Sequence, residues 1–139
     1  MADATHGPRE RPVSPNIQFD GGVWRWHLTM AASIAHRVTG IVLYLGALVM
    51  LVWALSLASG PDAYAAFAAL AGSWIGKAGF FVLTLSIFYH LGNGVRHLVW
   101  DAGYGFAPRT ATRSAWVVIA FAVLATLALW GLVIRAGGL

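Results

Sequence analysis

Three long stretches without a charged side chain constrain the fold of this 139-residue chain more than any other feature. They occupy residues 38–58, 78–95 and 115–134, and each is close to the ~20 apolar residues that cross a bilayer as a helix. The chain is 59% hydrophobic and 10% charged, against roughly 45–50% and about 25% in soluble domains. So small a protein could not bury that much apolar surface in water. The sequence therefore predicts an all-α membrane protein with three transmembrane helices.

Polar and helix-breaking residues mark where the membrane part begins and where its spans end. Residues 1–26 include Pro8, Pro12 and Pro15 and are predicted to form a polar segment outside the membrane. Residues 27–139 then form the anchor domain. The alanine-rich piece at 63–71 is too short to cross and is predicted to be an interfacial helix. We expect the three spans at about 28–58, 76–101 and 114–135.

Basic residues near the span ends predict the orientation, because cytoplasmic segments carry the excess of Lys and Arg. One side of the membrane has five basic residues and the other has Lys77 and Arg135. The N-terminus is therefore predicted to be cytoplasmic and the C-terminus periplasmic. The basic residues are scattered, so nucleic-acid binding has no support. The five on the first side are Arg9, Arg11, Arg25, Arg109 and Arg113.

The absence of cysteine limits the chemistry that the chain can hold. Disulfides, thiolate zinc sites, cysteine-ligated iron–sulfur clusters and covalent haem attachment are excluded. Histidine and three methionines remain as soft ligands.

The first polar cluster in the apolar region is Ser33, His36 and Arg37. Ser33 and Arg37 are four residues apart, so on a helix they share one face. A guanidinium and a hydroxyl near the membrane surface suit a ligand with carbonyl or carboxylate oxygens. The alternative is that Arg37 only extends toward lipid phosphate.

The second polar cluster forms a stripe along the second span. His90, Gly94, His97 and Asp101 follow at i, i+4, i+7 and i+11, which places them on one side of a helix. His90 lies deepest, because twelve uncharged residues separate it from Lys77. A neutral imidazole at that depth needs a metal or a hydrogen-bond partner. Haem iron would supply one. Gly92 and Gly94 leave room beside it for a flat macrocycle or for a neighbouring helix.

Three further residues of this cluster lie nearer the cytoplasmic end. Arg96 and His97 are placed to meet either haem propionates or the membrane interface. Asp101 can form an ion pair with one of them, relay protons, or simply end the span.

Read together, these motifs resemble the cytochrome b membrane-anchor subunits of succinate dehydrogenase. The resemblance rests on Arg-Pro-Val-Ser-Pro at 11–15, on Ser-Ile-Ala-His-Arg-Val-Thr-Gly at 33–40, and on the His-x-x-x-Gly-x-Arg-His-Leu-x-x-Asp pattern at 90–101. It departs from the family at Asn16 and Phe19, and no acidic residue follows Asp101 in the connector. The resemblance implies three helices that form half of a two-subunit haem-binding bundle.

The resemblance also implies roles for individual residues. His90 matches an axial ligand of haem b, whose other ligand comes from a second small hydrophobic subunit. Ser33 and Arg37 match quinone-binding positions, and His36 and Arg37 match positions near the haem propionates. Asp101 matches an acidic position linked to proton delivery, with supporting or proton-relay roles also expected for Arg96 and His97.

The same resemblance places the chain in a larger enzyme of the bacterial inner membrane. Succinate oxidation is implied on a flavoprotein subunit, with electrons crossing an iron–sulfur subunit to ubiquinone, so this chain is a non-dehydrogenase subunit. Two alternatives are a haemless structural anchor and the anchor of a fumarate reductase running in the opposite direction. A proton-coupled transporter component is disfavoured, because the three short spans show no inverted repeat and no broken helix.

Overall fold

The computed structural model describes residues 27–138. That part of the chain contains four helices and no strand, which confirms the predicted all-α fold class. The polar segment 1–26, with its prolines, its basic residues and the 11–15 motif, lies outside the described residues, as does residue 139. The four helices are α1 (Leu28–Ser59), α2 (Pro61–Gly72), α3 (Trp74–Asp101) and α4 (Pro108–Arg135).

Helices α1, α3 and α4 are long and apolar enough to cross a membrane. They contain 32, 28 and 28 residues, and at about 1.5 Å per residue each exceeds the ~30 Å hydrocarbon core. Most of their large apolar side chains are exposed. In a bilayer these side chains meet lipid or another subunit, so the exposure is expected for a membrane helix.

Helix α4 begins at Pro108, six residues before the start of the predicted span. Proline at the first helical turn fits, because its missing N–H would have no partner there and its φ is already helical. The turn from α3 is tight, with Gly103 and Gly105 at φ of 89° and 80°. The Nε1–H of Trp100 donates to the Gly105 carbonyl at 3.3 Å. The helix therefore extends beyond the uncharged run into the connector.

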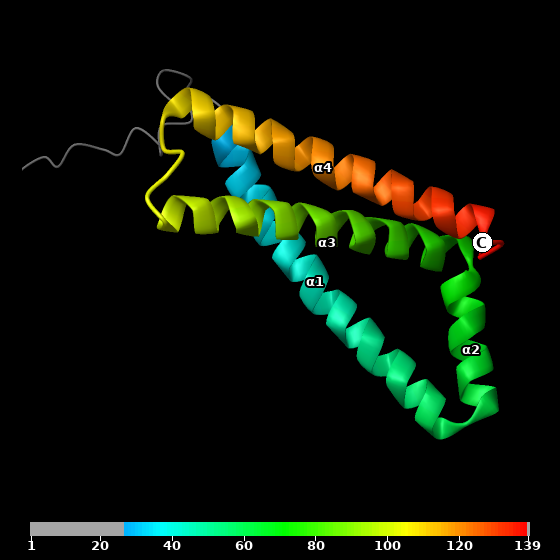
Figure 1. Ribbon diagram of the computed structural model, residues 1–139. Helices are drawn as coiled ribbons and strands as arrows, with labels where there is room; N and C mark the ends of the chain where they lie inside the picture. Colours follow the sequence, from blue (N-terminus) through cyan, green and yellow to red (C-terminus); the bar gives the residue numbers. More distant parts are fainter. Residues whose placement is uncertain (1–26, 139) are drawn as a thin grey trace, which may run out of the picture.

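Helix α2 contains the alanine-rich segment and is too short, at 12 residues, to span a bilayer. Gly60, with φ of 107°, reverses the chain between α1 and α2, and Pro61 starts the new helix. Ser73 then caps α3 by accepting a hydrogen bond from the Gly76 N–H at 3.1 Å. In Figure 1, α2 joins the separated ends of α1 and α3, so that the three helices form a triangle.

Helices α3 and α4 lie side by side over their whole length (Figure 1). The buried residues of α4 follow one another at intervals of three or four and are mostly small, which lets the two backbones approach closely. Tyr89 of α3 packs against Val118 and Ala122 in the centre of this contact. The buried stripe of α4 consists of Ala111, Ala115, Val118, Ala122 and Thr126.

Helix α1 crosses α3 and then diverges from it toward α2 (Figure 1). The crossing includes Gly46, where an added Cβ would clash with the side chain of Leu83. Beyond that point the three helices enclose an apolar hollow of about 300 Å³. Leu45, Val49, Phe67 and Phe80 are among the residues that line it. The part of the α1–α3 contact that faces α2 is therefore apolar.

Candidate functional site

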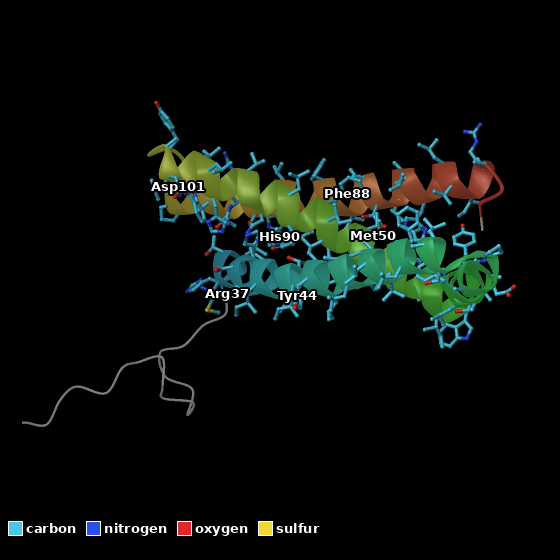
Figure 2. The ribbon with its side chains drawn as sticks, turned by 90° about the horizontal axis from the view of Figure 1, so that it is seen from below. Arg37, Tyr44, Met50, Phe88, His90 and Asp101 are labelled. Carbon is cyan, nitrogen blue, oxygen red and sulfur yellow. The ribbon has the colours of Figure 1, made fainter. Side chains whose placement is uncertain are left out.

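Three histidines gather where α1 crosses α3. The rings of His36 and His90 are stacked, with centroids 3.9 Å apart and planes at 19°. The ring of His97 lies 5.3 Å from that of His36. Figure 2 shows His90 between α1 and α3, with Arg37 and Asp101 toward the same end of the molecule. The structure thus brings His36 of the first polar cluster against His90 and His97 of the second.

The Nδ1 atom of His90 is held by α1. It lies 3.1 Å from the His36 carbonyl oxygen and 3.2 Å from the Thr39 hydroxyl. A carbonyl oxygen can only accept, so this contact requires the proton to be on Nδ1. The neutral imidazole then carries its lone pair on Nε2. This is the tautomer that a metal ligand adopts when its other nitrogen donates to a backbone carbonyl.

The surroundings of the two glycines next to His90 differ. A Cβ added to Gly92 would lie 3.2 Å from the Phe121 ring and 3.4 Å from Val118, both on α4. Gly92 therefore serves helix packing, which was one of its two predicted uses. At Gly94 nothing lies within 4 Å of such a Cβ. That position, one turn from His90 on the same side of α3, leaves open space.

His36 has a polar atom that the described residues do not satisfy. Its Nδ1 is buried and has no hydrogen-bond partner within residues 27–138. A buried imidazole nitrogen without a partner costs free energy, so it marks a place where a further group would be favourable.

Ser33 and Arg37 lie on α1, Ser33 three residues before His36 and Arg37 directly after it. Ser33 is half-buried and Arg37 is exposed. They are one turn apart, as predicted for a shared face. The exposed guanidinium is accessible to a ligand or to lipid phosphate, and the geometry leaves both of these predicted uses open.

Arg96 is buried between α3 and α4, at 5% exposure. Its Nε donates to Ser114 Oγ at 2.9 Å and its Nη2 to the Ala111 carbonyl at 3.0 Å. Its Nη1 donates to Asn93 Oδ1 at 3.3 Å, and the guanidinium lies 3.9 Å from the centre of the Trp100 ring. The guanidinium is thus bound to α4 rather than placed beside the His90 ring. The supporting role of Arg96 stays a prediction.

His97 and Asp101 complete the stripe toward the end of α3. His97 is half-buried and meets Trp100 edge to face at 5.2 Å. Asp101 is the last residue of α3 and is exposed. Its position is accessible to water, and its predicted part in proton delivery remains to be tested.

Several polar residues without a predicted role also make hydrogen bonds or are buried in this region. Thr39 contacts His90, Tyr89 donates from its hydroxyl to the Ala32 carbonyl at 2.9 Å, and Asn93 is fully buried beside Arg96. A signal was present for each, because all three are polar residues in a span within four residues of a predicted site residue. That signal does not tell which helix each side chain faces.

Within residues 27–138 no group of three His, Cys, Asp or Glu side chains could hold a bare metal ion. Residues 7–129 match the family described as succinate dehydrogenase/fumarate reductase transmembrane subunit. The chain belongs to this family. The resemblance seen in the three motifs is thereby confirmed.

Individual relatives agree with the family match. The chain is 38% identical over 127 residues to the succinate dehydrogenase cytochrome b556 subunit of Paracoccus denitrificans, covering 89% of this chain and 91% of that protein. The subunit of the same name from Rickettsia felis is 35% identical over 121 residues, or 87% and 91% of the two chains. A pig (Sus scrofa) relative, the mitochondrial cytochrome b560 subunit, is 35% identical over 86% of this chain and 69% of its own length.

Family membership and the three apolar helices together establish a multi-pass membrane protein. The matched region includes the histidine cluster and all of α1, α2 and α3. The α1–α3 crossing therefore lies within the matched region.

Proposed function

We propose that this chain is the cytochrome b anchor subunit of a succinate dehydrogenase, binding haem b through His90 and ubiquinone through Ser33 and Arg37. The names of its relatives support the cytochrome and the enzyme. The observation that carries the haem ligand is the contact between His90 Nδ1 and the His36 carbonyl at 3.1 Å. That contact leaves the Nε2 lone pair of an intramembrane histidine for iron.

The residues at the crossing fit a haem. Besides the Nε2 lone pair, there is open space at Gly94 and a His36 nitrogen that has no partner among residues 27–138. Haem iron with two imidazole ligands supplies reversible one-electron storage when it is bound. His90 provides one imidazole from this chain. We expect the second from another small hydrophobic subunit, because the His36 ring is stacked on that of His90 at 3.9 Å and so does not lie where an imidazole on the opposite side of the iron would be.

The other residues of the cluster provide polar contacts around that ligand. His36 and Arg37 are the groups of this chain proposed to bind the propionates, through an imidazole N–H and a guanidinium. Arg96 contributes indirectly, because its three hydrogen bonds to Ser114, Ala111 and Asn93 hold the end of α3 in place.

A quinone would bind on the Ser33 side of α1. The Ser33 hydroxyl and the Arg37 guanidinium both donate, and donors aimed at a quinone carbonyl stabilise negative charge as it develops on the oxygen. Reduction of a quinone to a quinol also consumes two protons. Asp101 at the exposed end of α3 and the half-buried His97 are the ionisable groups of this chain placed to supply them.

The proposed enzyme has further subunits. Succinate oxidation belongs on a flavoprotein subunit, and an iron–sulfur subunit passes electrons to the quinone. Arg109 and Arg113 lie at the Asp101 end of the bundle, so we place this end and the N-terminus on the cytoplasmic side of a bacterial inner membrane, with the C-terminus in the periplasm. The relatives named as succinate dehydrogenases favour succinate oxidation over fumarate reduction.

A difference spectrum tests the haem ligand. Reduced-minus-oxidised spectra of the purified complex are compared between wild type and His90→Leu at matched protein. A haem b band that is lost or shifted in the variant is expected. His27→Leu, at an exposed residue just before α1, is the matched control and should keep the band. An unchanged band in His90→Leu would contradict this ligand, and no band in wild type would indicate a haemless anchor.

The quinone site is tested in the same preparations with Ser33→Ala. This variant should keep the haem band. Its rate of quinone reduction should fall by roughly tenfold or more, because one donor to the quinone carbonyl is removed. Ser59→Ala, at the other end of α1, is the matched control. Unchanged quinone kinetics in Ser33→Ala would exclude Ser33 from the site.

A further inference from the structure

We propose that Thr39 and Gly40 of α1 are positioning residues for His90, and that their contacts set the redox potential of the haem it binds. This inference rests on the proposed function, since it requires His90 to be an iron ligand. It adds two residues to which the sequence motifs gave no role. Both lie on the helix opposite the one that carries the imidazole: Thr39 contacts its Nδ1, and Gly40 leaves room for its Cε1.

The Thr39 hydroxyl is a second acceptor for the His90 Nδ1 proton. Its oxygen lies 3.2 Å from Nδ1 and 2.9 Å from the carbonyls of both Ala35 and His36. A hydroxyl has one proton. Because the His36 carbonyl already accepts from His90, donation to Ala35 is the arrangement that satisfies every group. The oxygen lone pairs of Thr39 then face Nδ1–H.

Gly40 sets how closely the ring approaches α1. A Cβ at this position would lie 3.2 Å from His90 Cε1 and 3.8 Å from Nδ1. The first distance is tighter than an ordinary van der Waals contact, so a side chain here would push the ring outward. Thr39 therefore holds Nδ1 by a polar contact, and the missing side chain of the adjacent Gly40 leaves room for the neighbouring Cε1.

These contacts affect the charge on the iron-binding nitrogen. An acceptor for Nδ1–H draws the proton away from the ring, which raises the electron density at Nε2 and makes it a stronger ligand for oxidised iron. Loss of the Thr39 acceptor should therefore favour the reduced form and raise the midpoint potential. A hydrogen bond of ordinary net strength corresponds to roughly a threefold to tenfold change in the reduction equilibrium.

Docking of α1 on α3 can be tested separately from the imidazole contact. The Tyr89 hydroxyl donates to the Ala32 carbonyl, one turn before His36, at 2.9 Å. It joins the same two helices without touching the His90 ring. Tyr89→Phe is thus a matched control that weakens the crossing and leaves both contacts to Nδ1 intact.

The test uses the assembled complex in native membranes, with Thr39→Val, Thr39→Ser and Tyr89→Phe compared with wild type. Haem content, midpoint potential by redox titration, and the electron paramagnetic resonance g-values of the oxidised haem are measured. Thr39→Val should retain haem and raise the potential, a tenfold change being about 59 mV for one electron. Thr39→Ser keeps the hydroxyl and should have the wild-type potential, and Tyr89→Phe should also leave the potential unchanged.

Gly40→Ala provides a second variant that keeps the hydroxyl. The added methyl group should move the g-values while haem content is retained, because the ring must rotate or shift. If Thr39→Val fails to assemble, this variant decides: unchanged g-values overturn the inference.

The outcomes separate this inference from the function on which it rests. A wild-type potential in Thr39→Val, or an equal shift in Tyr89→Phe, overturns the positioning role while loss of haem in His90→Leu still supports the ligand. An unchanged haem band in His90→Leu overturns the proposed ligand, whatever Thr39→Val shows.

Discussion

The α3–α4 contact and the α1–α3 crossing join helices in different ways. Along α4, small buried residues such as Ala115 and Ala122, each 1% exposed, let the backbones lie close over the full helix length. At the crossing the helices meet over a shorter stretch, and hydrogen bonds from Tyr89 and His90 reach backbone carbonyls of α1. The first contact depends on shape, and the second on polar groups.

The difference shows where chemistry can be placed in a small bundle. Close packing of α3 on α4 leaves little space at Gly92, where an added Cβ would lie 3.2 Å from the Phe121 ring. At the crossing, by contrast, nothing lies within 4 Å of a Cβ added at Gly94, and a buried His36 nitrogen has no partner among the described residues. The closely packed α3–α4 pair therefore provides a rigid surface against which α1 packs.

The largest expected effect comes from filling the α3–α4 contact. Ala115 is buried, with 1% of its surface exposed, and Ala115→Leu would insert three more carbons there. Overpacking of this kind lowers the free energy of unfolding by about 3 kcal/mol at the upper end. We expect a lower unfolding temperature of the detergent-solubilised complex. Ala120→Leu, on an exposed position of the same helix, should change little. Equal stability of the two variants would contradict close packing at Ala115.

A smaller effect is expected from the polar group within that contact. Arg96→Gln cannot make the three hydrogen bonds of the guanidinium, and the buried Asn93 Oδ1 loses the donor that Arg96 provides, at a cost of about 2 kcal/mol. Arg109→Gln, on an exposed side chain of α4, is the matched control. Thermal stability measures both. If Arg96→Gln matched its control, the buried network would contribute nothing to folding.

The smallest effect is expected at the crossing. Tyr89→Phe removes one buried hydrogen bond to α1 and keeps the ring, so it should cost about 1 kcal/mol. Tyr44→Phe, at 67% exposure on α1, provides the comparison in the same thermal assay. A cost equal to that of Ala115→Leu would mean that the crossing, and not the α3–α4 contact, limits stability.

The lengths of the three uncharged runs predicted the three long helices, because a helix that crosses a bilayer needs about 20 apolar residues and few charges. The start of α4 at Pro108 was not predicted, because the apolar run begins only at Ala115 and the connector residues before it are polar. Helix bounds depend on local caps, and the hydropathy of the run does not report them.

For the site, the spacing of His90, Gly94 and His97 predicted one side of α3, but not the helix that this side faces. The rotation of α3 about its axis follows from how Tyr89 and Asn93 pack, and that depends on the small residues of α4. For the same reason the sequence did not place Arg96 against Ser114, or Thr39 against His90. Contacts between distant residues require the packed structure.

The burial of Arg96 has a consequence for how this protein enters the membrane. A helix that carries an arginine inserts at a cost when it faces lipid alone, and Arg96 finds two of its acceptors, Ser114 and the Ala111 carbonyl, on α4. Only the tight turn between Asp101 and Pro108 separates the two helices. We therefore expect α3 to partition into the bilayer together with α4 as a helical hairpin during synthesis, after α1 has already been released into lipid.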